Sequence, residues 1–236
     1  RWEQQAPQLP CRSESRRVDA DRFCAGIKRF VLGLSKKVLL ADQLALICAK
    51  VTSVPAATLP APILLLGYTA YMMQLYFDFS GYSDMAIGIG EFFGITLPEN
   101  FDYPYLACSV GEYWRRWHIS LSGWFRDYVY IPLGGNRRGL AVQLRNIAVV
   151  WLLTGFWHGA SWNFVMWGLY YFVILFIEKL FLLKALDKLP RLFRHAYALL
   201  LIVIGWVIFA SDDVSVLLPY LGSLFGANGA VGGMGV

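Results

Sequence analysis

Residues 146–178 read NIAVVWLLTGFWHGASWNFVMWGLYYFVILFIE, an almost entirely apolar stretch that is interrupted at TGFWHGASWN. As one helix these residues would be about 50 Å long, because each helical residue adds about 1.5 Å. That length is too great for one crossing of a bilayer and too small for two comfortable ones, since a span needs about 20 residues. The stretch therefore predicts a re-entrant hairpin, or two short helices broken at the glycine-rich turn. Either arrangement would place His158 deep in a membrane.

The composition also favours a membrane protein. Hydrophobic residues make up 57% of the 236 residues and charged residues only 16%, whereas about a quarter of a soluble domain is charged. So few charges exclude an ordinary cytosolic globule, and an aromatic content of 16% excludes disorder. Apolar segments at 62–77, extending toward Phe93, and at 196–210 predict further spans. The sequence thus predicts an all-α, polytopic transmembrane protein with broken or re-entrant helices.

The basic residues indicate the topology. Lys and Arg fall in three blocks, ten within residues 1–50, six within 115–145 and five within 179–194. The positive-inside rule places these blocks in the cytoplasm, which suits the net charge of +5 better than nucleic-acid binding does. Residues 1–22 are expected to form a cytoplasmic loop, 23–54 an interfacial helix leading into a membrane helix, and 222–236 a loose, glycine-rich end.

Residues 112–126 predict an amphipathic helix lying in the membrane interface. At about 100° per residue, an aromatic face with His118 forms on one side and a basic face with Arg115 and Arg116 on the other. The aromatic face consists of Trp114, Trp117, His118, Leu121, Trp124 and Phe125. Such a two-faced helix is typical of interfacial segments.

Two of the three histidines are candidate functional residues. An ionisable group at the depth expected for His158 is a functional-site hypothesis, although a packing histidine bonded to a neighbouring carbonyl is the alternative. His118 suits a packing role and a functional role equally well. His195, at the edge of a span, is expected to be merely interfacial.

Other chemical signatures are absent. The four cysteines have no C-x-x-C spacing, which argues against zinc and against a disulfide framework, and we expect no metal site. FSGYSDM does not match G-x-S-x-G, and GGNRRG lacks the Lys-Ser/Thr of a phosphate loop. Gly90-x-x-x-Gly94 matches a helix-contact motif but is weak. Asp78, Asp84 and Glu91 would line a polar path or face the adjacent loop.

Several long motifs closely resemble the membrane-bound O-acyltransferase family. They are GLSKKVLLADQLA (33–45), FDFSGYSDMAIGIGEFFGITLPENFDYPY (77–105), EYWRRWHISLSGWFRDYVYIPLGGNRRG (112–139), and GFWHGASWNFVMWG (155–168). IPLGGNRRG is more similar to the alginate O-acetyltransferase branch than to the D-alanylation branch. The chain departs from the pattern at Tyr170–Phe172, where relatives usually have His-Gly, and at Phe209-Ala210, where they often have Phe-Arg.

The resemblance implies a single membrane-embedded acyltransferase domain over residues 1–236, the C-terminal half of the family domain. Family members are about twice this long and the chain begins with Arg1, so we expect a fragment whose missing helices complete the catalytic vessel. The implied protein is a multi-pass enzyme of the cell membrane. It would pass an acyl group, most simply acetyl, from a cytoplasmic thioester to a hydroxyl of an exported polysaccharide such as alginate, directly or through a partner protein.

The resemblance also implies roles for particular residues. His158 corresponds to the catalytic histidine and His118 to a second functional position. Arg115, Arg116, Trp117, Trp157 and Asn163 are expected to bind donor or substrate, and Arg137 and Arg138 to attract donor phosphates or an acidic carrier protein. Positive-inside topology explains the arginines equally well. The donor would be acetyl-CoA or an acylated carrier protein, with no tightly bound cofactor.

Two other classes of function remain open. Intramembrane polar residues and broken helices also occur in transporters, so the alternative is an export subunit that moves polysaccharide or lipid without bond chemistry. A scaffold in an export complex is the third. Acyl transfer from a labelled thioester separates the enzyme from both.

Overall fold

The computed structural model describes residues 18–55, 58–211 and 221–223, and all regular structure in these residues is helical. The all-α prediction is therefore confirmed for this part of the chain. Of the loop predicted at 1–22 and the loose end predicted at 222–236, residues 1–17 and 224–236 lie outside the described part, whereas residues 20–22 and 222–223 are helical. The chain divides into two compact units, one of residues 1–48 and 70–100 and the other of residues 49–69 and 101–236.

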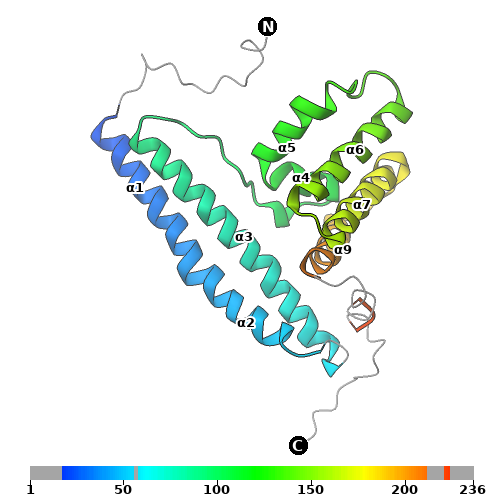
Figure 1. The fold of residues 1–236 in the computed structure, drawn as a ribbon, viewed down its shortest axis with the longest axis horizontal. Helices are drawn as coiled ribbons and strands as arrows, with labels where there is room; N and C mark the ends of the chain where they lie inside the picture. Colours follow the sequence, from blue (N-terminus) through cyan, green and yellow to red (C-terminus); the bar gives the residue numbers. More distant parts are fainter. Residues whose placement is uncertain (1–17, 56–57, 212–220, 224–236) are drawn as a thin grey trace, which may run out of the picture. The chain divides into compact units, whose positions relative to one another are not determined.

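In the first unit, α1 (Ala20–Ser35) and its π-helical continuation η2 (Lys36–Ala41) lie alongside α3 (Ala61–Phe92) (Figure 1). Asp84 of α3 pairs with Arg29 at 2.7 Å and with Lys36 at 2.6 Å. Asp78 and Glu91 likewise pair with Lys37 and Arg22. The three acids therefore neutralise the cations of the neighbouring helix, rather than lining a separate polar path.

Glycines bring the backbones of α1 and α3 together at two places. A Cβ on Gly26 would lie 2.8 Å from the carbonyl oxygen of Gly88, and one on Gly81 would lie 2.7 Å from that of Gly33. Side chains at these positions would force the helices apart. Gly90 and Gly94 instead belong to the end of α3, where Gly94 has φ 68° and Ile95 donates its N–H to the Gly90 carbonyl at 2.8 Å. This is a helix C-cap and not a helix-contact motif.

The second unit is built around the hairpin of α6 (Leu140–His158) and α7 (Trp162–Ile177), with α9 (Arg191–Ala210) packed against α7. A Cβ on Gly155 would collide with the Phe164 carbonyl oxygen, and one on Gly168 would collide with that of Trp151. The two helices therefore cross in close backbone contact. The predicted break at the glycine-rich turn is confirmed.

The predicted limits of this hairpin were too narrow. α6 begins at Leu140 and includes Gln143, Arg145 and Asn146 in its first turns. Beyond α7, η6 (Glu178–Leu182) and α8 (Leu183–Leu186) continue the chain helically. Within the described residues, α6 and α9 are long and apolar enough to cross a membrane. The long α3, predicted to contain a span, is not among them, because tyrosines, Gln74 and acids lower its hydropathy.

The predicted amphipathic helix at 112–126 is wrong as a single element. The chain forms two seven-residue helices, α4 (Val110–Arg116) and α5 (Ile119–Phe125), with an extended Trp117 and a left-handed His118 between them. The common aromatic face is lost at this corner, since Trp117 is buried whereas Trp124 is exposed. The remaining elements are α2 (Asp42–Thr52), η4 (Pro104–Leu106) and η5 (Arg126–Tyr130).

Candidate active site

His158 is the last residue of α6 and lies where three helices meet. Its ring contacts Trp157, Trp167 of α7 and Phe209 of α9, with centroid distances of 4.9, 5.0 and 5.3 Å. The close crossing at Gly155 and Gly168 positions the Trp167 ring against His158, because Gly168 directly follows Trp167. Phe209, which precedes the departure from the family pattern at Ala210, therefore forms part of the surroundings of the histidine.

The half-buried His158 ring has no hydrogen-bond partner within the described residues, because no side chain or carbonyl there bonds to either of its nitrogens. A histidine retained for packing would be expected to have at least one nitrogen satisfied. The geometry thus favours the functional interpretation over the carbonyl-bonded alternative.

Trp157 contacts both histidines. Its ring centroid lies 4.9 Å from that of His158 and 6.4 Å from that of His118, and its side chain is exposed. The two imidazoles are close enough to interact electrostatically. The fold therefore brings together His118, Trp157 and His158, three of the residues predicted from sequence.

His118 has an uncommon backbone conformation, with φ 47° and ψ 56° at the start of α5. A left-handed non-glycine residue persists only where its surroundings hold it, and such residues cluster at functional sites. Ser120 Oγ lies 3.3 Å from its Nδ1. Burial lowers the pKa of His118 to about 4, so the ring is a neutral imidazole at pH 7.

Trp117 and Asn163 lie in the interior. Trp117 is 6% exposed and packs against Phe101 and Trp206, so it supports the corner at His118 by packing. Asn163, 3% exposed, donates from Nδ2 to the Phe209 carbonyl at 2.9 Å. It thereby ties the start of α7 to the residue whose ring faces His158.

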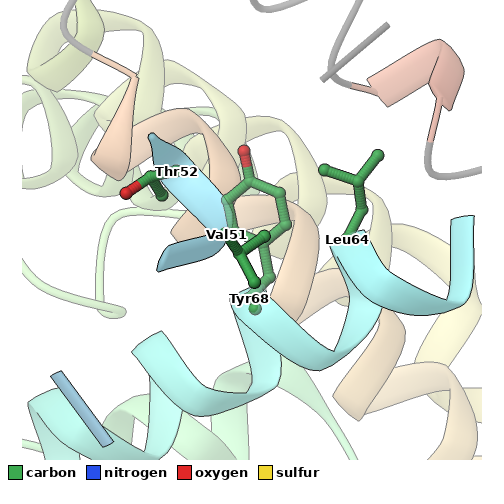
Figure 2. Close-up of a pocket in the computed structure, with 5 residues that line it drawn as sticks. Val51, Thr52, Leu64 and Tyr68 are labelled. Atoms are coloured by element: carbon green, nitrogen blue, oxygen red, sulfur yellow. The ribbon is translucent and has the colours of Figure 1, made fainter. Parts of the chain in front are cut away.

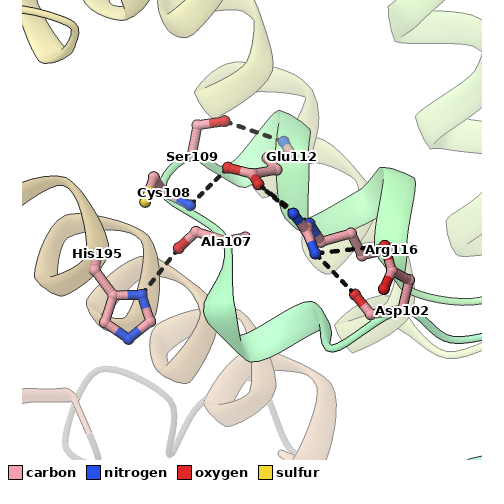
Figure 3. A network of polar contacts seen from close by, with 7 residues as sticks. All are labelled: Asp102, Ala107, Cys108, Ser109, Glu112, Arg116 and His195. Atoms are coloured by element: carbon pink, nitrogen blue, oxygen red, sulfur yellow. Dashed lines mark hydrogen bonds and ion pairs between the residues drawn. The ribbon is translucent and has the colours of Figure 1, made fainter. Parts of the chain in front are cut away.

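The predicted arginines divide into two groups. Arg116 is held by Glu112 at 2.9 Å and by Asp102, as Figure 3 shows. Its guanidinium therefore fixes the loop before α4. Arg115, Arg137 and Arg138 are exposed and form no ion pair within the part of the chain that the structure describes.

His195 has a structural contact that the sequence did not predict. Its Nδ1 lies 3.1 Å from the Ala107 carbonyl (Figure 3), an arrangement in which the imidazole N–H donates. It links α9 to the segment leading into α4. Tyr170 of α7 also bonds to this helix, donating to the Leu201 carbonyl of α9 at 2.8 Å.

A small hollow elsewhere in this unit is lined by Val51, Thr52, Leu64, Gly67 and Tyr68 (Figure 2). It contains no charged side chain and none of the predicted site residues. The described residues also contain no group of three or more His, Cys, Asp or Glu side chains that could hold a metal ion. The two histidines therefore remain the centre of the candidate site.

Comparison with known proteins matches residues 2–211 to the sequence model of the membrane-bound O-acyltransferase (MBOAT) family. The chain is 45% identical over 205 residues to a probable alginate O-acetylase AlgI of Azotobacter vinelandii, covering 87% of this chain and 41% of that protein. It is 41% identical over 207 residues to a peptidoglycan O-acetyltransferase of Helicobacter pylori, covering 86% and 39%. A teichoic acid D-alanyltransferase of Bacillus subtilis is 34% identical over 173 residues, covering 68% and 43%. The chain thus spans about two-fifths of the length of these relatives.

Proposed function

Because the chain belongs to the membrane-bound O-acyltransferase family, we propose that it forms the histidine-bearing part of an enzyme that acylates an exported polysaccharide. The names of two of these relatives specify O-acetylation of alginate and of peptidoglycan. The higher identity to these proteins than to the D-alanyltransferase supports acetyl as the transferred group. The observation that carries the proposal is that His118 and His158 both contact the ring of Trp157.

In the proposed reaction, His158 is the general base. Its unbonded imidazole nitrogen takes the proton of the acceptor hydroxyl as that oxygen attacks the thioester carbonyl. The new C–O bond forms, the C–S bond breaks, and the leaving thiolate receives the proton from His158. Transfer through an acyl-histidine intermediate is the alternative route.

His118 supports the same reaction as a neutral imidazole. In the tautomer in which Ser120 donates to Nδ1, the proton of the ring is on Nε2, which can donate to the thioester carbonyl oxygen. A donor aimed at that oxygen stabilises the negative charge that develops there. Its low pKa suits this role, because the ring then carries a single proton to donate throughout the neutral range.

The donor is proposed to be acetyl-CoA or an acylated carrier protein, reaching the site from the cytoplasm. The exposed Arg115, Arg137 and Arg138 would attract its phosphates or acidic surface. The acceptor is an exported polysaccharide or a partner protein that passes the acyl group on. The enzyme would lie in the cell membrane as a multi-pass protein, in which α6 and α9 are described helices long and apolar enough to cross.

The test is acyl transfer from a labelled thioester by the purified complete protein. His158→Ala should lower turnover by about 10² to 10⁴, the usual contribution of a positioned base, without preventing membrane insertion. His158→Gln retains a polar side chain but cannot act as a base, so it should fail equally. Polysaccharide transport without acyl turnover would support the export-subunit alternative and contradict the proposal.

A further inference from the structure

Glu178 is a buried carboxylate that the proposed reaction does not use. It is the first residue of η6 and is 2% exposed. It forms no ion pair within the described part of the chain. A buried charge is expensive unless hydrogen bonds satisfy it, so the groups that face Glu178 indicate its role.

Those groups are the backbone of α4 and one tyrosine. Oε1 accepts the N–H of Val110 at 2.8 Å and Oε2 accepts the N–H of Gly111 at 2.9 Å. The Tyr197 hydroxyl donates to Oε1 at 3.2 Å. The carboxylate therefore faces the positive end of a helix, where negative charge is favoured.

The first turn of α4 depends on Glu178 for two of its N–H groups. Ser109 Oγ accepts the N–H of Glu112 at 3.0 Å, and the Glu112 carboxylate accepts that of Cys108 at 2.8 Å (Figure 3). These local caps leave the N–H groups of Val110 and Gly111 unsatisfied within the helix. Glu178, which is 68 residues away from Val110, satisfies both and so fixes α4 to the end of α7.

The other end of α4 leads directly to His118. The helix is only seven residues long, and Trp117 is the single residue between it and the histidine. Trp114 of α4 contacts Trp151 of α6 and Trp167 of α7, at centroid distances of 4.9 and 5.4 Å. A displacement of the first turn would thus be transmitted through a short, rigid element to the left-handed corner.

We propose that Glu178 is a positioning residue, which sets the place of His118 relative to His158 by holding the first turn of α4 against α7. The proposal rests on the acyl transfer proposed above. Glu178 acts through α4, because its hydrogen bonds go to Val110, Gly111 and Tyr197 and to neither histidine.

The test compares Glu178→Gln with a matched control in the complete protein. Glutamine replaces one of the two carboxylate oxygens by an NH₂ donor, which cannot accept the backbone N–H that it faces, so one of the two hydrogen bonds to α4 is lost and His118 should shift. We expect kcat to fall about 10- to 100-fold, since misplacement by about 1 Å can cost 10²-fold, with the KM for the donor within about twofold of the wild type. Tyr170→Phe, which removes the hydrogen bond to Leu201 and leaves α4 intact, should keep kcat.

A second variant protects the test against misfolding. A Cβ on Gly111 would lie 3.3 Å from Glu178 Oε2, so Gly111→Ala should loosen the same contact and lower kcat several-fold. Wild-type kcat in Glu178→Gln, or in Gly111→Ala where the first variant does not accumulate, would overturn the proposal. A fall in kcat no larger than that of Tyr170→Phe would also overturn it.

Thiol labelling separates this proposal from the acyl transfer itself. Cys108 is 8% exposed and lies just before α4. In a background with the other cysteines replaced by serine, Glu178→Gln should accelerate its labelling at least several-fold. If the wild-type protein shows no acyl transfer, the proposed function fails, and faster labelling still supports the hold of Glu178 on α4. An unchanged labelling rate would contradict that hold.

Discussion

The burial of His118 makes the stability of the fold depend on pH. Burial lowers its pKa to about 4, below the value of about 6.5 for an unfolded histidine. Between these pH values the unfolded chain binds more protons than the folded one, so the stability of the fold decreases as the pH falls through this window. Above about pH 6.5 His118 is neutral in both states and contributes no pH dependence.

This sign gives a prediction for His118→Gln. Glutamine cannot titrate, so the variant should lose less stability than the wild type when the pH is lowered from about 6.5 to 4. Thermal unfolding in detergent at several pH values measures the difference. Equal losses in both proteins would show that His118 does not carry the buried, neutral imidazole described above.

The same residue should matter for turnover. We expect His118→Ala to lower acyl transfer while the protein still inserts into membranes, because its ring lies near Trp157 and His158 and not in a separate core. Kinetics of the purified complete protein with a labelled thioester provide the measurement. Unchanged kinetics would assign His118 to packing alone.

The sequence predicted the candidate histidines but not the distant residues that contact or position them. His158 and His118 lie in recognisable motifs, and Trp157 is adjacent to one of them. Glu178 and Phe209 lie far along the chain from the residues they serve, so nothing in their local patterns indicated those contacts. The helical wheel failed at 117–118 because it cannot detect a left-handed residue between two short helices.

At the scale of helices, the close crossing of α6 and α7 holds His158 in place. Gly155→Ala would put a Cβ into the Phe164 carbonyl oxygen, which must move α7 or the end of α6. We expect loss of about 1 to 3 kcal/mol of stability, the usual cost of overpacking, and a marked loss of turnover. Thermal unfolding and acyl transfer measure the two effects.

Gly123→Ala is the matched control for this substitution. Gly123 lies in α5, and a Cβ there meets no atom within 4 Å. Alanine in a helix is favoured over glycine by up to about 1 kcal/mol, so this variant should be as stable as the wild type or slightly more stable. Similar losses in both variants would show that the α6–α7 crossing has no special role.

The ion pairs between α1 and α3 give a second prediction at this scale. Asp84→Asn would remove the acidic partner of Lys36 and one of the two acidic partners of Arg29, which also pairs with Glu99. Both cations are about one-third exposed, so we expect a loss of about 1 to 3 kcal/mol, less than for a fully buried pair. Asp42→Asn, at an exposed pair with Lys37, should cost less than about 1 kcal/mol. Thermal unfolding of the two variants tests the difference.

For the whole molecule, the charges outside the α6–α7 hairpin constrain its topology. Arg137 and Arg138 precede α6, Lys184 lies in α8, and Lys188 follows α8. The positive-inside rule predicts that both ends lie on the cytoplasmic side. The apolar stretch at 146–178 alone is too short for two comfortable crossings. The helices extend beyond it at both ends, from Leu140 to Leu186, and this adds the missing length.

The length of α6 favours a hairpin that spans the membrane over a re-entrant one, and thiol labelling can distinguish the two. Its 19 residues correspond to about 28 Å, close to the hydrocarbon core of about 30 Å. If α6 crosses, the exposed Ala160 in the turn after His158 lies at the outer surface. On intact cells an impermeant thiol reagent should then label Ala160→Cys and leave Arg137→Cys unlabelled, while opened cells should allow both to react. Labelling of Arg137→Cys on intact cells would reverse the topology. Protection of both residues on intact cells would indicate a re-entrant hairpin, with His158 buried within the membrane and not near its outer face.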